Sequence, residues 1–115
     1  MPDLPVIAIT SGEPAGIGPE LMAAIDAADF PARLVILGDE NLIQQRAEAI
    51  GQSIELAAYQ ASNPTPSTGL EIKHIALNKP SVAGKLDSKN ARYVLNTLDD
   101  ACQGCLQGEY NAMVT

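Results

Sequence analysis

Residues 6–20 read V-I-A-I-T-S-G-E-P-A-G-I-G-P-E, and this stretch decides the fold class. It begins with a short apolar run, which is typical of a strand that is covered on both faces. Three glycines and two prolines follow before the chain turns to helix formers. Pro19 suits the first turn of a helix, and Glu20 favours the positive end of the helix dipole. The stretch therefore predicts a strand, a tight junction and a helix over about 19–28.

Apolar runs and helical patterns alternate along the rest of the chain. We expect strands at 34–37, 53–57, 70–77 and 111–115, and helices at about 40–50 and 88–107. The last helix is expected to pack through the apolar positions Ala91, Val94, Leu95, Leu98, Cys102 and Cys105. Residues 60–69 predict an exposed loop, and the region 62–87 leaves room for a hairpin or an edge strand. The alternation predicts an α/β fold in three layers with a mostly parallel sheet.

The composition restricts the class of partner. The 115 residues carry a formal net charge of −7, and no cluster of Lys and Arg stands out. This argues against a nucleic-acid or anionic-membrane partner, because both are bound largely through basic patches. An anionic substrate stays open, since one Arg and a few backbone N–H groups can hold a phosphate.

No sequence feature indicates a membrane or secreted protein. No apolar stretch approaches the roughly 20 residues that span a bilayer. The N-terminus carries an acid and lacks the basic region of a signal peptide. The two cysteines do not make a secreted disulfide framework. We therefore expect a cytoplasmic protein.

The three glycines of the junction stand at positions 12, 16 and 18. This spacing matches neither the dinucleotide fingerprint G-x-G-x-x-G nor a Walker A loop, which needs a following Lys and Ser or Thr. Glycines at a helix N-terminus can let a ligand approach the backbone closely. A tight strand-to-helix turn without a ligand needs the same residues, and the spacing alone favours this turn.

Three further motifs have a structural and a functional interpretation. Asp39 lies where a dinucleotide-binding protein keeps its ribose-binding acid, but an acid before an amphipathic helix also suits an N-cap, which we favour. The pair Cys102 and Cys105 lies near a helix C-terminus, where the dipole does not favour a thiolate, so we expect both to pack on the inner face. His74 is the only histidine and cannot form a metal site alone. We identify no catalytic or metal-binding residue in this chain.

The junction I-T-S-G-E-P-A-G-I-G-P-E resembles the N-terminal motif of the 4-hydroxythreonine-4-phosphate dehydrogenase family of pyridoxal phosphate biosynthesis. The resemblance continues through residues 34–39, through P-S-V-A-G-K-L at 80–86 and through C-Q-G-C-L-Q-G-E at 102–109. Isocitrate and isopropylmalate dehydrogenases share the fold and carry a shorter loop, G-D-G-I-G-P-E. The extra residues Pro14 and Ala15 favour the hydroxythreonine phosphate branch.

The resemblance implies an enzyme that is larger than this chain. The family is homodimeric, depends on NAD or NADP and a divalent metal (zinc, magnesium or cobalt), and oxidises 4-phosphooxy-L-threonine. Loss of carbon dioxide then gives 3-amino-2-oxopropyl phosphate. Residues 1–115 would form the N-terminal part of the first α/β domain of a two-domain enzyme, so the isocitrate/isopropylmalate dehydrogenase-like fold is expected to be incomplete. The family's metal-binding histidines and substrate contacts would lie beyond Thr115, and the chain alone is expected to be inactive.

The resemblance also suggests where the cofactor lies. By analogy with the related dehydrogenases, Gly12, Glu13, Gly16 and Gly18 are expected to be neighbours of the nicotinamide cofactor. Three other interpretations stay open: a paralogue acting on 4-phosphorylated threonate or erythronate, a phosphate acyltransferase of the same fold, and a non-enzymatic α/β module that binds a small anion.

Overall fold

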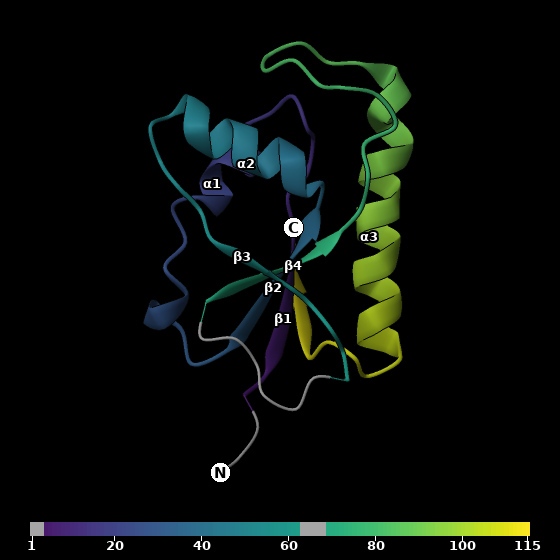
Figure 1. The fold of residues 1–115 in the computed structure, drawn as a ribbon. Helices are drawn as coiled ribbons and strands as arrows, with labels where there is room; N and C mark the ends of the chain where they lie inside the picture. Colours follow the sequence, from purple (N-terminus) through teal and green to yellow (C-terminus); the bar gives the residue numbers. More distant parts are fainter. Residues whose placement is uncertain (1–3, 63–68) are drawn as a thin grey trace.

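The computed structural model describes residues 4–62 and 69–115. Within them a five-stranded sheet has the order β3-β4-β2-β1-β5, and every pair of neighbouring strands is parallel (Figure 1). The strands are β1 (Val6–Thr10), β2 (Arg33–Gly38), β3 (Leu56–Ala58), β4 (Leu70–His74) and β5 (Ala112–Val114). β2 is buried at each of its positions, as expected for a central strand of a parallel sheet.

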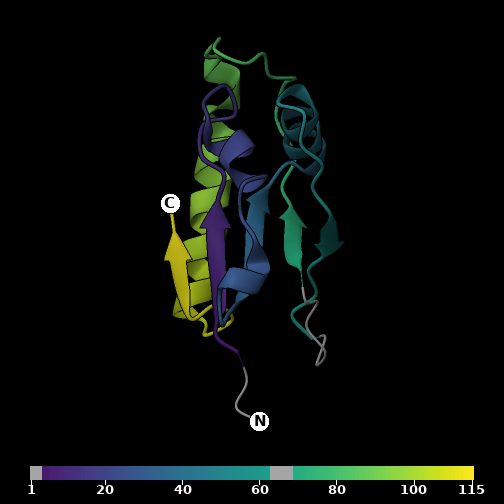
Figure 2. The same cartoon turned by 90° about the vertical axis from the view of Figure 1, so that its left-hand side faces the viewer.

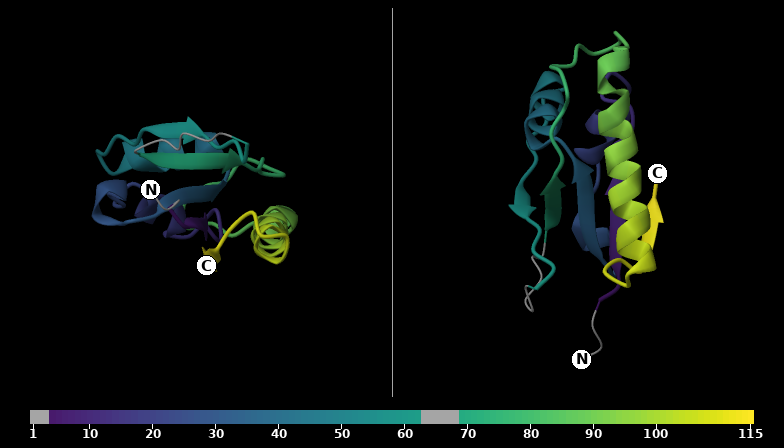
Figure 3. Two further views of the ribbon diagram at one scale, coloured as in Figure 1. Left: turned by 90° about the horizontal axis from the view of Figure 1, so that it is seen from below. Right: turned by 90° about the vertical axis from the view of Figure 1, so that its right-hand side faces the viewer.

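Helices cover both faces of this sheet, which confirms the three-layer α/β fold. The helices are α1 (Gly18–Met22), α2 (Glu40–Ala49) and α3 (Ala91–Leu106), with short 3-10 turns at Ala27–Asp29 and Ser88–Asn90. α3 runs along one face and packs against β1, β2 and β5, whereas α1 and α2 lie on the other face (Figures 2 and 3). No helix among the described residues combines the length and the apolar character needed to cross a membrane.

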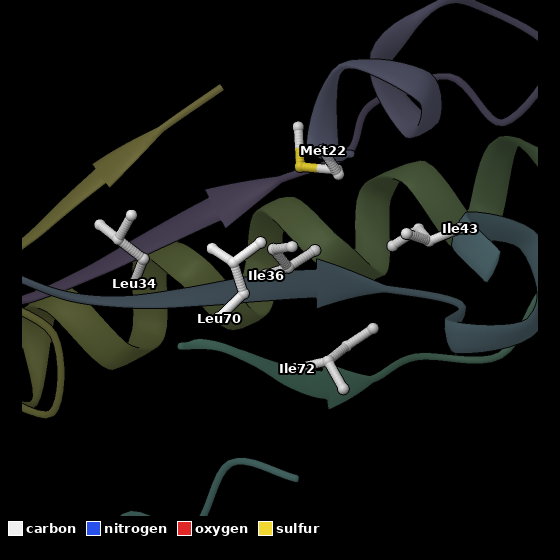
Figure 4. Packing of buried hydrophobic residues seen from close by; sticks show 6 residues of the cluster. All are labelled: Met22, Leu34, Ile36, Ile43, Leu70 and Ile72. Carbon is white, nitrogen blue, oxygen red and sulfur yellow. The ribbon is translucent and has the colours of Figure 1, made fainter. Parts of the chain in front are cut away.

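Two hydrophobic cores lie on opposite faces of the sheet. The first joins α1 and α2 to β2 and β4 through Met22, Leu34, Ile36, Ile43, Leu70 and Ile72 (Figure 4). The second lies under α3 and contains Ala8, Val35, Leu37, Ala101 and Tyr110. Successive strand residues point to opposite faces, so the β-branched and aliphatic runs of the sequence supply both cores at once.

Several predicted boundaries differ from the structure. The first helix ends at Met22 rather than near residue 28, because Asp26 accepts a hydrogen bond from the Ala28 N–H at 3.0 Å and starts a 3-10 turn instead. β3 begins later than expected, and β4 ends at His74 rather than near 77. β4 is not an edge strand, since it pairs with β2 and with β3. The predicted loop at 60–69 falls largely on 63–68, outside the described residues.

The buried face of α3 was also predicted wrongly. Its buried residues are Tyr93, Thr97, Ala101 and Gly104, whereas Leu95 remains 48% exposed. The reason is steric, because a Cβ at position 104 would overlap the Tyr110 ring. Small and hydroxyl-bearing residues allow the close approach to the sheet, and the larger aliphatic residues lie beside this stripe.

The connections of the sheet reverse direction beside β1. The chain passes from β1 to its neighbour β2, whereas β5 on the other side of β1 is reached from β4 through α3. In open parallel sheets, ligands bind outside the carboxyl ends of the strands at such a reversal. The loop that follows β1 therefore lies at the expected ligand-binding edge.

Candidate functional site

The loop after β1 forms a closed turn with defined contacts. Glu13 shapes the turn twice: its carbonyl oxygen accepts the Gly16 N–H at 3.0 Å, and its carboxylate accepts the Ala15 N–H at 3.1 Å. Pro14 and Ala15 are buried, whereas Gly12, Glu13 and Gly16 are partly accessible. The loop is thus anchored at its centre and accessible at its flanks.

The glycines of this loop have three different structural explanations. A Cβ at Gly18 would overlap the carbonyl oxygen of Ser11, so the group that approaches this glycine is the protein's own backbone. A Cβ at Gly16 would lie 3.3 Å from the Glu13 carbonyl oxygen, which is tight. Gly12 has a φ of 76°, and a Cβ there would meet no described atom within 4 Å. Only Gly12 combines a required backbone conformation with open space.

Arg46 of α2 holds the loop through hydrogen bonds to two of its backbone carbonyl groups. Its guanidinium donates to the Pro14 carbonyl at 2.6 Å and to the Gly16 carbonyl at 3.1 Å, and its Nη1 lies 3.6 Å from a Glu20 carboxylate oxygen. The side chain is only 7% exposed. A planar guanidinium presents several donors in a fixed arrangement, so it can hold two carbonyl groups at once.

Tyr93 of α3 connects the ends of β1 and β2. Its hydroxyl oxygen accepts the Asp39 N–H at 2.9 Å and lies 3.2 Å from Ser11 Oγ. Since the Asp39 N–H already donates to this oxygen, the phenolic proton is available for Ser11. Burial raises the pKa of the Tyr93 hydroxyl above its ordinary value. A Cβ at Gly38 would lie only 2.7 Å from Ser11 Oγ, so this junction requires glycine.

Asp39 is an N-cap, as predicted, and both of its carboxylate oxygens are occupied. Oδ1 accepts the Leu42 N–H at 3.1 Å, and Oδ2 accepts the Leu77 N–H at 2.9 Å. His74 adds to the same helix end, because its Nδ1 accepts the Glu40 N–H at 3.1 Å. His74 therefore makes a structural contact at the N-terminus of α2.

A cleft opens beside this helix end. It has a volume of about 310 Å³ and is lined by Asp39, Asn41, Leu42, Gln45 and residues 77–81. The following turn is held against the glycine loop, because the Gly84 N–H donates to the Ala15 carbonyl at 2.9 Å. The carboxyl edge of the sheet is thus formed by residues 11–18, by the start of α2 and by the segment that leads from β4 to α3.

The cysteine pair follows its prediction only in part. Cys105 packs against the core under α3, but Cys102 is exposed and its Sγ lies 3.8 Å from Met113 Sδ. Both are free thiols. Among residues 4–62 and 69–115, no three His, Cys, Asp or Glu side chains are grouped so that they could hold a metal ion.

Sequence reasoning did not identify Ser11, Arg46 or Tyr93. A signal for Arg46 was present, because it falls on the same helical face as Leu42, Ile43 and Ala47, where a charged residue needs buried partners. Tyr93 belongs to a set of only three tyrosines in the chain. Its partners are distant in sequence, so its role could not be derived from local patterns.

The model of the family described as "Pyridoxal phosphate biosynthetic protein PdxA" matches residues 30–115. The chain belongs to this family. It is 53% identical to the 4-hydroxythreonine-4-phosphate dehydrogenase of Azoarcus sp. over 115 residues, which is 100% of this chain and 35% of that protein. The enzyme of the same name from Chromobacterium violaceum is 49% identical over the same share of each chain. The chain thus spans about a third of the length of these relatives.

Solved structures support the fold. The crystal structure of a 4-hydroxythreonine-4-phosphate dehydrogenase from Burkholderia phymatum matches 97% of this chain and 36% of its own, with a TM-score of 0.79 at 20% identity. The enzyme of the same name from Klebsiella pneumoniae matches with a TM-score of 0.76 at 21% identity. The α/β architecture of this chain is therefore shared with about a third of each of these structures.

Proposed function

We propose that this chain is the N-terminal third of a 4-hydroxythreonine-4-phosphate dehydrogenase, which oxidises 4-phosphooxy-L-threonine with NAD or NADP. The observation that carries the proposal is the 53% identity to the Azoarcus enzyme along the whole chain. The relatives extend well beyond the matched third, so the chain alone is expected to be inactive.

Gly12, Glu13, Gly16 and Gly18 are proposed as neighbours of the nicotinamide cofactor. Their place at the reversal beside β1 supports this assignment. The contacts of Gly16 and Gly18 are made within the loop, which leaves Gly12 and Glu13 as the residues with accessible surface and no tight backbone approach. When bound, the cofactor would accept the hydride from the substrate alcohol. The chain would orient it by keeping the loop rigid through Arg46 and Tyr93.

The divalent metal of the proposed enzyme finds no complete ligand set among the described residues. In line with the family resemblance, we propose that it is bound by residues outside this chain. A homodimeric, cytoplasmic enzyme and a phosphorylated hydroxy amino acid substrate belong to the same proposal. They rest on membership of a pyridoxal phosphate biosynthetic family.

A hybrid gene tests the proposal in cells. Residues 1–115 would replace the matching residues of the Azoarcus enzyme, since the two segments are 53% identical over 115 residues. The hybrid would be expressed in a bacterial strain that lacks its own enzyme and needs added pyridoxine. We expect growth without pyridoxine. Growth that still requires pyridoxine, with the hybrid present as soluble protein and the parent enzyme restoring growth, would refute the proposal.

A further inference from the structure

The segment from Leu77 to Arg92 differs in charge from the rest of the molecule. It carries four of the seven basic residues and only one acid, although the whole chain has a net charge of −7. The basic residues are Lys79, Lys85, Lys89 and Arg92. They are spaced too widely to form a run in the sequence, and two of them, Lys79 and Lys85, line one small cavity.

This segment lies at the same edge as the glycine loop. It connects the carboxyl end of β4 to the start of α3 (Figure 1). The Gly84 N–H bonds the Ala15 carbonyl at 2.9 Å, and the Lys79 N–H bonds Asn90 Oδ1 at 2.8 Å. The backbone of the segment is therefore fixed to the glycine loop at its centre and closed on itself by the bond between Lys79 and Asn90.

A small cavity of about 110 Å³ lies within the segment, lined by Lys79, Pro80, Val82, Lys85 and Asp87. The acid is already occupied: Asp87 Oδ2 lies 3.2 Å from Lys79 Nζ, and Oδ1 accepts the Lys89 N–H at 2.9 Å. Lys85 is exposed, and its ammonium group has no hydrogen bond or ion pair within the described part of the chain. The cavity thus has spare positive charge.

One buried side-chain amide at the start of α3 lacks a hydrogen-bond partner among the described residues. α3 continues the 3-10 turn Ser88–Asn90, whose N-cap Asp87 accepts the Lys89 N–H at 2.9 Å with its carboxylate and the Asn90 N–H at 3.0 Å with its carbonyl oxygen. Asn90 is 1% exposed, and its Nδ2 has no hydrogen-bond partner among residues 4–62 and 69–115. Lys89 and Arg92 add positive charge that repels the positive end of the helix dipole, and Asp87 is the one acid of the segment that offsets it. An anion at this end would relieve the repulsion.

We propose that the Leu77–Arg92 segment binds a phosphate group of the ligand that occupies the carboxyl edge of the sheet. The proposal rests on the proposed function for the source of this group. The source is either the phosphate monoester of the hydroxy amino acid or the diphosphate of the nicotinamide cofactor. Both offer the same chemistry to the segment: a compact, doubly accepting anion that pairs with Lys85 and with the charges at the start of α3.

Binding can be measured on the 115-residue chain by NMR. Backbone amide signals would be followed while inorganic phosphate, O-phospho-L-threonine or NAD is added, with sodium chloride at matched ionic strength as the reference. We expect saturable shifts for residues 84–92 with phosphate. A tighter response to O-phospho-L-threonine than to NAD identifies the monoester as the source, and the reverse order identifies the cofactor.

Charge-removing variants locate the site. Lys85→Met and Arg92→Met are each expected to weaken phosphate binding about tenfold, the loss of one charge-assisted contact. Lys73→Met is the matched control, because it removes a lysine that pairs with Asp100 outside the segment. Shifts no larger than those with chloride, or equal weakening by Lys73→Met, would overturn the proposal.

A hybrid enzyme gives a second readout that separates the two proposals. If the hybrid is active, Lys85→Met should raise about tenfold the KM of whichever ligand the NMR titration identifies, the phosphorylated substrate or NAD, and leave kcat unchanged. An active hybrid whose KM values are unaffected by Lys85→Met would reject the phosphate site and leave the dehydrogenase assignment in place. Phosphate binding by the chain, together with a folded hybrid that is inactive, would support the phosphate site and reject the dehydrogenase assignment.

Discussion

Arg46 joins α2 to the loop after β1 with a single side chain. Its guanidinium contacts the carbonyl groups of Pro14 and Gly16, and the side chain is almost fully buried. Buried carbonyl groups that lose their donor pay the full cost of desolvation. Arg46 therefore helps to hold the shape of the glycine loop.

Arg46→Met should lower the free energy of unfolding by about 2–4 kcal/mol, because it leaves two carbonyl groups without their donors. The measurement is urea unfolding followed by circular dichroism. Arg92→Met is the control, since Arg92 is exposed, and its effect should stay within about 0.5 kcal/mol. Equal effects of the two substitutions would show that the Arg46 contacts do not stabilise the loop.

Gly18→Ala should destabilise the fold by about 3 kcal/mol or more, because the new methyl group overlaps the Ser11 carbonyl oxygen. Gly51→Ala provides the comparison: Gly51 has a φ of 73° and open space around its Cα among the described residues. Its cost should be about 1–2 kcal/mol, that of the left-handed conformation alone. Thermal unfolding of both variants measures the two stability costs. A Gly18→Ala protein as stable as the wild type would contradict the close approach.

At the level of the elements, α3 holds the carboxyl edge together. Its buried stripe runs from Tyr93 to Gly104, and the Tyr93 hydroxyl bridges the ends of β1 and β2. The same helix begins in the basic segment and ends where Gly104 packs against Tyr110. Its position therefore determines the geometry of the proposed site.

Tyr93→Phe should cost about 1–3 kcal/mol of unfolding free energy, because the buried Asp39 N–H loses its acceptor. Tyr59→Phe is the matched control: its hydroxyl makes a longer, 3.3 Å hydrogen bond to Glu109 at a partly buried position. We expect less than about 1 kcal/mol there. Denaturant titration measures both values, and a smaller loss for Tyr93→Phe than for Tyr59→Phe would contradict the bridging role.

The elements differ in how far the sequence predicted them. Continuous apolar runs such as residues 34–37 located the central strands, and Asp39 before an apolar helix correctly indicated a cap. The buried face of α3 could not be predicted, because Tyr93 on this face contacts Ser11, which lies 82 residues away in the sequence. The glycine motif suggested a ligand-binding loop, which stays a prediction, and its spacing could not show that Gly18 contacts the protein's own backbone.

At the level of the whole molecule, all three tyrosines link α3 or the sheet to neighbouring elements, and burial raises the pKa of each. The pKa of Tyr59 rises to about 12 from an ordinary value of 10.0. A raised pKa means that the folded state keeps the phenolic proton at a pH where the unfolded state has lost it. Stability is therefore complete below pH 10.0 and decreases as the pH rises toward 12.

We accordingly expect tyrosinate absorbance to appear together with the loss of circular dichroism when the protein is titrated with alkali. The urea-unfolded chain is the reference and should ionise near the ordinary value of 10.0. Reversible ionisation of all three tyrosines near pH 10.0 with the fold intact would contradict the burial described here.

We propose above all that residues 1–115 supply the N-terminal third of a working dehydrogenase. The most direct test is the rate of NADH formation from 4-phosphooxy-L-threonine and NAD by the purified hybrid with the Azoarcus enzyme. We predict a kcat within about tenfold of the parent enzyme, a difference of about 1.4 kcal/mol in the barrier. A folded hybrid that forms no NADH or NADPH, under conditions in which the parent enzyme turns over, would contradict the claim.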